Sequence, residues 1–409
     1  MKDIKIADLI KQEQIRQKNE LQLIPSENYV SSDVLQALGS VFTNKYSEGY
    51  SGKRYYQGNK IVDKVEELAV ERAKDLFKAE YVNVQPLSGS PANLAVYLAM
   101  LKSGDTILSM NLASGGHLSH GSPVNIVSKL YNVEFYDVNK RTFELDYDEI
   151  LQTAKKVKPK LIIAGASAYP RKIDFEKFRK IADEVGAFLM ADIAHIAGLV
   201  VSEQHMTPVP FADIVTTTTH KTLRGPRGGM IMGKAQYSEK IAKAVFPGGV
   251  QAGPHNNVHA AKAVAFYEAS KPEFKNYSKQ VVTNAKVLAE ELKNKGFNVL
   301  TGGTDNHLML IDVTNFCNDG KQCAIALENA GIIVNYNMIP YDTKTPFRPS
   351  GIRLGTPAIT SRGMGQNDMK TIASFIDEVV KNVKDKSAQQ KINGQVKEFC
   401  SQFFVPGID

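Results

Sequence analysis

One lysine is hard to explain as a surface residue. It lies in the segment VTTTTHKTLRGPRGG, from Val215 to Gly229. The sequence before it predicts the end of a buried strand, and Lys221 is followed by glycines and a proline that are unsuited to a helix. Lysine does covalent chemistry chiefly as an amine that condenses with a carbonyl, and pyridoxal phosphate (PLP) is the commonest carbonyl cofactor held in this way. A solvated lysine in a surface turn is the competing interpretation, and the residues expected around Lys221 decide between the two.

A PLP lysine needs an acid for the pyridine nitrogen, a flat group on the ring, a phosphate seat and a cation for the substrate carboxylate. Asp192 ends the strand that precedes the lysine strand and is the candidate acid. His117 follows a Gly-Gly turn and is the candidate to stack on the ring, while His195 lies one turn beyond Asp192. Arg353, in SGIRLGTPA, can bind a carboxylate with its two-pronged guanidinium, and Arg227 is a further cation close to the lysine.

The candidate phosphate seat is the turn Ser88, Gly89 and Ser90, which leads into a helical segment. Such a turn presents backbone N–H groups and the positive end of a helix, although an ordinary helix cap is the competing interpretation. Half of a metal site is a competing interpretation of Asp192 with His195, but the sequence offers no further ligands at a suitable spacing.

Apolar strands that alternate with helical patterns must position these residues. Predicted strands begin near residues 81, 105, 133, 161, 188, 213 and 228, and helices are expected at 61–78, from 91, from 146 and from 174. This order predicts an α/β domain with a mainly parallel sheet and helices on both faces. Ligands of such sheets bind at the carboxyl ends of the strands. His117, Asp192, His220 and Lys221 all lie at such strand ends or in the loops that follow them.

The remaining segments predict a helix that ends before Leu21, an irregular tyrosine-rich loop over residues 42–58 with Glu48 in it, and a C-terminal α+β region that closes with one long helix from about Gln366. We expect three parts: an N-terminal arm (residues 1–45), a large α/β domain (46–268) and a small α+β domain (269–409).

Composition excludes some classes of protein. The chain has 409 residues and a formal net charge of +7, with its lysines spread along the sequence. No window resembles a membrane span or a signal peptide, so a cytoplasmic protein is expected. Three cysteines are too few and too badly spaced for a disulfide framework or a zinc site. The charge allows nucleic-acid binding as a second activity, but no compact basic motif supports it, and an anionic substrate or phosphorylated cofactor suits the charge equally well.

Eight segments, in order from about residue 23 to 362, together resemble serine hydroxymethyltransferases: SENY, TNKYSEGYSGKRYY, NVQPLSGSPAN, GGHLSHGSPVN, DIAHIAGL, VTTTTHKTLRGPRGG, TGGTDNHL and SGIRLGTPA. The resemblance implies a PLP-dependent transferase of fold type I, with a sheet of the seven-stranded type. It implies reversible transfer of the serine hydroxymethyl carbon to tetrahydrofolate, giving glycine and 5,10-methylenetetrahydrofolate through aldimine and quinonoid intermediates. It also implies a homodimer or tetramer with shared active sites.

Residue roles follow from the resemblance position by position. Catalytic roles fall on Lys221, Glu48, His220 and Asp192. Cofactor contacts fall on Ser88, Gly89, Ser90, His117, Asp192, His195, Thr218, His220, Lys221 and Gly253. Substrate contacts fall on Ser26, Tyr46, Tyr56 and Arg353, with both tyrosines supplied by a neighbouring subunit. Folate contacts fall on Leu112, Gly116, His117, Leu118, Asn337, Thr345, Pro346 and Phe347.

Three positions depart from the family pattern. Ser114 replaces a histidine of the usual HGGH, Tyr336 replaces the lysine of NKN, and the loop PGGVQAGP is one residue longer than usual with Ala252 in place of a glycine. We expect this loop to approach the cofactor phosphate of the partner subunit. A folate-independent aldolase of β-hydroxy amino acids of the threonine type, on the same scaffold, is the alternative function. Glu48 and the tyrosine-rich loop favour the folate enzyme.

Overall fold

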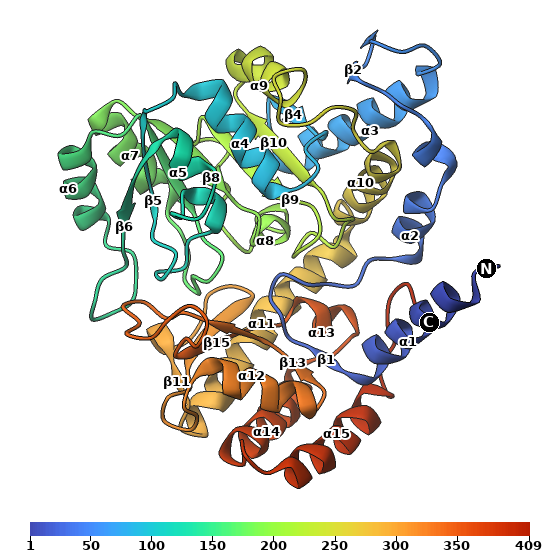
Figure 1. Ribbon diagram of the computed structural model, residues 1–409, viewed down its shortest axis with the longest axis vertical. Helices are drawn as coiled ribbons and strands as arrows, with labels where there is room; N and C mark the ends of the chain where they lie inside the picture. The colour runs from blue at the N-terminus through green and yellow to red at the C-terminus, as the bar shows by residue number, and fades with distance from the viewer. The chain divides into compact units, whose positions relative to one another are not determined.

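A computed structural model describes residues 1–409, which divide into two compact units (Figure 1). One unit comprises Val30–Ser278, and the other combines Met1–Tyr29 with Lys279–Asp409. The expected parts 1–45, 46–268 and 269–409 remain a prediction of domain organisation.

The larger unit is built around a seven-stranded sheet with the strand order β4-β10-β9-β8-β7-β5-β6. Six strands are parallel, and only β10 runs antiparallel to both of its neighbours. The strands are β4 (Tyr81–Asn83), β5 (Thr106–Met110), β6 (Asn132–Tyr136), β7 (Leu161–Gly165), β8 (Phe188–Asp192), β9 (Ile214–Thr218) and β10 (Gly229–Gly233). The predicted mainly parallel α/β sheet of the fold type I class is therefore confirmed.

Helices cover this sheet on both faces, as its apolar strands require. Alternate strand residues such as Leu161 and Ile163 join a core with Tyr97 of α4 and Ile241 of α9. On the other side α6 and α7 pack on neighbouring strands and on each other. The helices of this unit are α2 (Ser32–Leu38), α3 (Lys60–Phe77), α4 (Gly89–Met100), α5 (Val127–Leu130), α6 (Tyr147–Val157), α7 (Phe175–Val185), α8 (Ala197–Val201), α9 (Ser238–Val245) and α10 (Asn256–Ala269).

The tyrosine-rich segment is more regular than the sequence indicates. Residues 42–58 were expected to form an irregular loop, but they contain the antiparallel hairpin of β2 (Gly49–Tyr50) and β3 (Lys53–Arg54). Strands of two residues produce no visible alternation of polar and apolar side chains, which explains why the pattern did not reveal them. The turn needs glycine at position 49, whose φ is +93° and where a Cβ would lie 2.4 Å from the carbonyl oxygen of Lys53.

The smaller unit contains a four-stranded antiparallel sheet, β11-β12-β15-β14, and a parallel pair, β1 with β13. These strands are β1 (Leu21–Gln22), β11 (Asn298–Val299), β12 (Leu308–Asp312), β13 (Ile332–Ile333), β14 (Asn335–Asn337) and β15 (Gly351–Gly355). The helices are α1 (Ile4–Asn19), α12 (Gly320–Asn329), α13 (Pro357–Ser361), α14 (Gln366–Lys381) and α15 (Lys386–Cys400); α11 (Pro272–Asn294) contains the boundary between the units.

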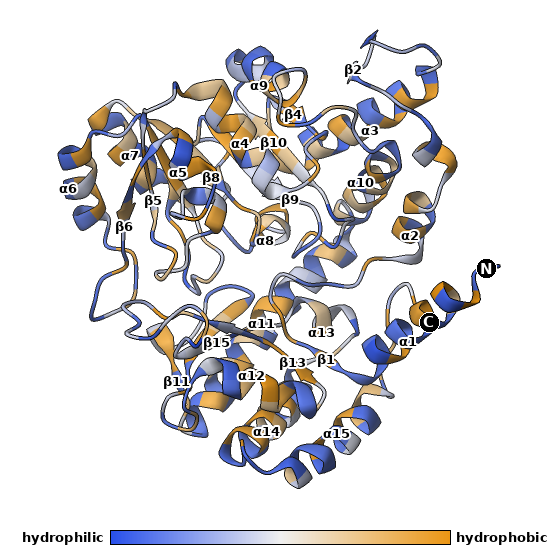
Figure 2. Cartoon of the chain, viewed as in Figure 1, coloured by the Kyte–Doolittle hydropathy of each residue, from blue (hydrophilic) through white to orange (hydrophobic).

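The expected single helix from Gln366 is wrong, because the chain forms α14 and α15 instead. α14 ends at Lys381, and Asp385 begins α15 by accepting hydrogen bonds from the N–H groups of Ser387 and Ala388. An N-cap of this kind starts a new helix. Hydropathy alternates around most helices, with α6 and α7 showing both polar and apolar faces (Figure 2). None of the helices combines the length and apolar character that a membrane crossing needs.

Candidate active site

Most predicted site residues of the larger unit follow the carboxyl ends of parallel strands. His117 lies in the segment after β5, Asp192 is the last residue of β8, and Lys221 follows β9 by three residues. Ser88 caps α4, which comes after β4. The sheet therefore brings these four segments to one edge, where ligands of such sheets bind.

Lys221 is buried, with 9 % of its surface exposed. The loop that carries it folds back on itself, because the N–H groups of Thr219 and Gly225 donate to the carbonyls of Gly228 and Thr219. Arg224 has a φ of +58°, a strained backbone conformation for a residue with a side chain. This closed loop holds the Lys221 backbone in one place.

Asp192 is the centre of a buried hydrogen-bond network. Its Oδ2 accepts from Nε2 of His120 and from Nδ2 of Asn93, each at 2.9 Å, and its Oδ1 accepts from the N–H of Ala194 at 3.0 Å. Burial alone would raise the pKa of Asp192, but the hydrogen bonds from His120, Asn93 and Ala194 outweigh burial and hold the pKa well below its usual value. The Asp192 carboxylate is therefore ionised at neutral pH.

His117 is joined to this network through Ser119. Its Nδ1 lies 2.7 Å from the Ser119 hydroxyl, which also accepts from Nδ2 of Asn93. The His117 N–H donates to Nδ1 of His120, so Nε2 of His120 is the nitrogen that donates to Asp192. Sequence reasoning missed Asn93, Ser119 and His120. The spacing of His117 and His120 in HLSH was the one available signal.

Asp192 and Lys221 are tied together by hydrogen bonds between the segments that follow β8 and β9. The Thr218 hydroxyl donates to the Ala194 carbonyl at 3.2 Å, and the Thr222 hydroxyl donates to the His195 carbonyl at 2.9 Å. His195 is buried. Its backbone carbonyl, which accepts from Thr222, supports the loop that carries Lys221. His195 thus lies in the region where the sequence predicted it.

The turn at Ser88 is built as a close-packed helix start. Gly89 and Ser90 form the first turn of α4, and the Ser88 side chain makes no capping hydrogen bond to it. A Cβ at Gly89 would lie 2.9 Å from Cγ2 of Thr218, so a larger residue would fill this space. Uncapped N–H groups at a helix start suit an anion such as a phosphate.

His220 and Arg227 flank the lysine. Burial, followed by the positive charges of Lys221 and Arg227, lowers the pKa of His220 to about 3. His220 is therefore a neutral imidazole at neutral pH, whose Nδ1 accepts from the Gly228 N–H at 3.5 Å. Arg227 is exposed.

Glu48 lies on a loop held by buried polar side chains. The Arg54 guanidinium donates to the carbonyls of Ser47 and Gly49, at 2.9 and 2.6 Å, and pairs with Glu66 at 2.9 Å. These contacts fix the backbone on both sides of Glu48. The sequence alone did not reveal Arg54 as an anchor, because two of its partners are backbone carbonyls, which no residue pattern marks, and the third is Glu66 on α3.

Tyr46 and Tyr56 contact each other edge to face, with ring centroids 5.4 Å apart, and both are about half exposed. A Cβ at Gly253 would lie 2.9 Å from Cε1 of Tyr46. The two tyrosines and the Gly253 loop therefore form one surface of the larger unit.

The segment after β5 carries the predicted folate residues Leu112, Gly116 and Leu118. A Cβ at Gly116 would lie 2.2 Å from the Met110 carbonyl oxygen, so only glycine fits. Leu118 is exposed. Ser114, which departs from the family pattern, donates its hydroxyl to Oδ1 of Asp137 at 2.6 Å and so ties this segment to the one after β6.

The smaller unit carries the other predicted residues. Arg353 lies on β15, where its Nε donates to Oδ1 of Asn335 on β14 at 3.1 Å. Burial lowers the pKa of Arg353 to about 10, so its guanidinium remains charged at neutral pH. Asn337 ends β14 and donates to the Met338 carbonyl. Ser26 is half-buried, whereas Thr345, Pro346 and Phe347 are exposed.

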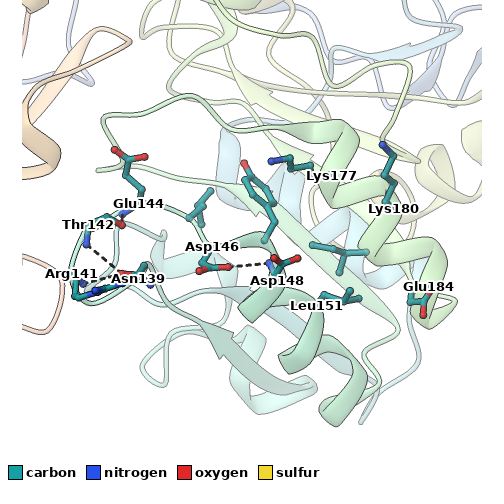
Figure 3. A pocket seen from close by; sticks show the side chains of 13 residues that line it. Asn139, Arg141, Thr142, Glu144, Asp146, Asp148, Leu151, Lys177, Lys180 and Glu184 are labelled. Carbon is teal, nitrogen blue, oxygen red and sulfur yellow. Dashed lines mark hydrogen bonds between the residues drawn. The ribbon is translucent and has the colours of Figure 1, made fainter.

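A separate groove of about 740 Å³ lies beside α6 and α7 and contains none of the predicted site residues. Figure 3 shows its lining, with Lys177, Lys180 and Glu184 from α7 and Asp148 and Leu151 from α6. Its lining carries both cationic and anionic side chains. The groove is therefore distinct from the edge of the sheet where Lys221 lies.

Comparison with known proteins shows which family the chain belongs to. The family model described as serine hydroxymethyltransferase matches residues 1–376. Three curated proteins named serine hydroxymethyltransferase are similar: one from Desulfotalea psychrophila (57 % identical, 100 % of this chain and 95 % of that protein), one from Acidothermus cellulolyticus (54 %, 100 % and 96 %) and one from Methanosarcina barkeri (55 %, 98 % and 98 %). With Lys221, Asp192 and the Ser88 turn gathered at one edge of the sheet, these matches show that the chain belongs to the serine hydroxymethyltransferase family.

Proposed function

We propose that this enzyme transfers the hydroxymethyl carbon of serine to tetrahydrofolate and forms glycine and 5,10-methylenetetrahydrofolate reversibly. The observation that carries the proposal is the site at the sheet edge: a buried lysine, a carboxylate ionised at neutral pH and an uncapped helix start in a member of this family. Each is a group that a PLP site requires.

The residues present fit PLP. Lys221 would hold its carbonyl carbon, Asp192 its pyridine nitrogen, His117 its ring face, and Ser88, Gly89 and Ser90 its phosphate. Thr218, His195, His220 and Gly253 complete the set of proposed cofactor contacts. When bound, PLP supplies an electron sink that stabilises negative charge at the substrate Cα. The uncapped first turn of α4, which Gly89 allows to pack against Thr218, supports the phosphate assignment.

The charged states of the remaining residues indicate what each of them would do. Asp192 stays ionised, so it favours a proton on the group opposite it. His220 is neutral at neutral pH and therefore acts there as a hydrogen-bonding group and not as a cationic acid. Arg353 keeps its charge and would bind the substrate carboxylate through two parallel hydrogen bonds. Ser26 would add a further polar contact to the substrate.

Glu48 would move the proton between the serine hydroxyl and the folate, on a loop whose backbone Arg54 fixes. Tyr46 and Tyr56 would contact substrate in a neighbouring subunit. We propose Leu112, Gly116, His117, Leu118, Asn337, Thr345, Pro346 and Phe347 for the folate side.

A spectroscopic titration tests the function. Protein with PLP should give an absorbance band that Lys221→Ala removes, and glycine with tetrahydrofolate should together produce a new long-wavelength band. Glycine alone should produce much less of it, because the folate enzyme responds to both substrates. If folate does not enhance the band, the folate-independent aldolase activity would replace this proposal.

We also propose a cytoplasmic homodimer or tetramer, with a large domain over residues 46–268, a small domain over 269–409 and an arm over 1–45. Three free cysteines suit a reducing compartment. The exposed apolar side chains of Val41, Tyr55 and Ile61, at 78, 66 and 60 %, support a partner surface near the tyrosines. A sedimentation measurement that finds only a monomer would contradict the shared site.

A further inference from the structure

Lys262, on α10, is a buried lysine to which the sequence assigned no role. Only 1 % of its surface is exposed. Its ammonium donates to three backbone carbonyls, those of Val84 at 2.5 Å, Gly229 at 2.7 Å and Pro86 at 3.3 Å. Burying a charge is costly unless it is well bonded, and here the bonding partners are main-chain oxygens of two separate segments.

The first segment leads directly into the proposed phosphate seat. Val84 and Pro86 lie between the end of β4 and Ser88, the N-cap of α4. Between them, the Gln85 side chain donates to the Gly49 carbonyl at 2.9 Å, and the Gln85 carbonyl accepts from Nε2 of Gln251 at 2.9 Å. Every residue from 84 to 86 is thus held by a side chain from another part of the unit.

The second segment closes the loop that carries Lys221. Gly228 accepts from the Thr219 N–H and donates to His220, while the Gly229 N–H donates to the Pro86 carbonyl at 3.0 Å. A Cβ at Gly228 would lie 2.5 Å from Cε of Lys262. A Cβ at Gly229 would lie 2.3 Å from the Ser88 carbonyl oxygen, so the two segments are in direct contact.

We propose that Lys262 is a positioning residue that fixes the phosphate turn at Ser88–Ser90 relative to the loop of Lys221. One ammonium bonds to both segments, and the distance between them must match the distance from the phosphate to the carbonyl carbon of the cofactor. The proposal rests on the proposed function of the site. Lys262 itself contacts neither cofactor nor substrate, because its donors are directed at the three carbonyls.

Charged neighbours surround this ammonium on several elements. Burial lowers the pKa of Lys262 to about 7, and the charge of Glu66 on α3 opposes this shift. His259 on α10 has its pKa lowered well below its usual value by burial and then by Lys262 and Arg54, so it contributes no positive charge at neutral pH. The geometry of the three carbonyls carries the proposal independently of these pKa values.

A competition between PLP and pyridoxal, which lacks the phosphate, tests the proposal. The holoenzyme is equilibrated with both aldehydes, and borohydride reduction fixes whichever is bound to Lys221 before mass spectrometry. Wild-type protein should prefer PLP strongly. Lys262→Met has a side chain of similar length but no donors, so the preference should fall about tenfold or more, the size of effect expected when a charge-assisted hydrogen bond that positions the phosphate turn is lost.

Two further variants control for general damage. Lys262→Arg keeps a charged donor and should retain more of the PLP preference than Lys262→Met. Ile150→Ala removes a buried side chain of α6, which packs on the strands at the other end of the sheet, and should leave the preference unchanged. Should Lys262→Met not fold, Lys262→Gln takes its place in the same comparison.

An unchanged ratio of bound PLP to bound pyridoxal in Lys262→Met or Lys262→Gln would overturn the proposal, and so would an equal loss of both aldehydes. A wild-type protein that binds neither aldehyde would instead refute the proposed function. The two failures are therefore distinguishable.

Discussion

At the scale of single residues, the charged states in the site follow from what surrounds each group. Asp192 is deeply buried yet ionised, because three donors compensate the loss of water. His220 is neutral, because burial disfavours its charged form and two cations lie beside it. Burial disfavours the charged form at both positions, and only at Asp192 do hydrogen bonds outweigh it.

The lowered pKa of His220 makes folding stability depend on pH. Between the usual pKa of 6.5 and the folded value of about 3, the unfolded chain binds a proton that the folded protein does not. The free energy of unfolding should therefore rise with pH across this range, by up to about 1.4 kcal/mol per pH unit from this residue. His220→Gln should remove that component.

Urea unfolding of wild type and His220→Gln at several pH values from 4 to 8 measures the difference. The exposed His255 provides the control variant His255→Gln. Parallel curves for wild type and His220→Gln between pH 4 and 6 would show that His220 takes up protons equally in both states.

Residue types and local spacing were sufficient to propose Lys221, Asp192, His117 and the Ser88 turn as site residues, because each follows a strand or precedes a helix; their roles stay predictions. Asn93, His120 and Lys262 were not predicted, because their hydrogen-bond partners lie far away in the sequence. His120 is 72 residues from Asp192, and Lys262 is 178 residues from Val84. No local pattern encodes such a pairing.

At the scale of elements, the strands and helices of the large sheet were predictable because their apolar periodicity is strong. The hairpin of β2 and β3 and the break between α14 and α15 were not. The hairpin depends on side-chain hydrogen bonds to the Gly49 carbonyl, one from Arg54 of β3 and one from Gln85, which lies 36 residues away. Tertiary contacts, and not propensity, define this element.

The contacts that hold the hairpin lead to a prediction about activity. Arg54→Met would remove the Arg54 donor to the Ser47 carbonyl, and would leave the Gly49 carbonyl and the Glu66 carboxylate with Gln85 as their remaining donor, so the loop of Glu48 should move. We expect kcat/KM to fall about ten- to hundredfold, because small displacements of a catalytic group cost rate. PLP content should be retained.

Arg72→Met is the matched control, because Arg72 also donates to a backbone carbonyl, that of Ala263 at 2.7 Å, but lies on α3 away from the hairpin. Kinetics and thermal unfolding of both variants separate the two effects. Equal losses of activity in Arg54→Met and Arg72→Met would mean that Arg54 contributes only to stability.

At the scale of the whole molecule, the fold explains where the chemistry lies. A mainly parallel sheet brings the ends of β5, β8 and β9 to one edge, and the family matches cover nearly the full chain. The lengthened loop with Ala252 is anchored at Gln251, whose side chain bonds to the Gln85 carbonyl and accepts from the Leu87 N–H. This loop is thus part of the support of the phosphate turn in its own chain.

Transfer of a labelled carbon tests the central claim most directly. Serine labelled at Cβ is incubated with the PLP-loaded protein and tetrahydrofolate, and the products are separated and followed by mass spectrometry. The label should appear in 5,10-methylenetetrahydrofolate, with one unlabelled glycine formed for each label transferred, and Lys221→Ala should abolish the transfer. Label that remains in serine, or that leaves serine at the same rate without folate, would contradict the assignment.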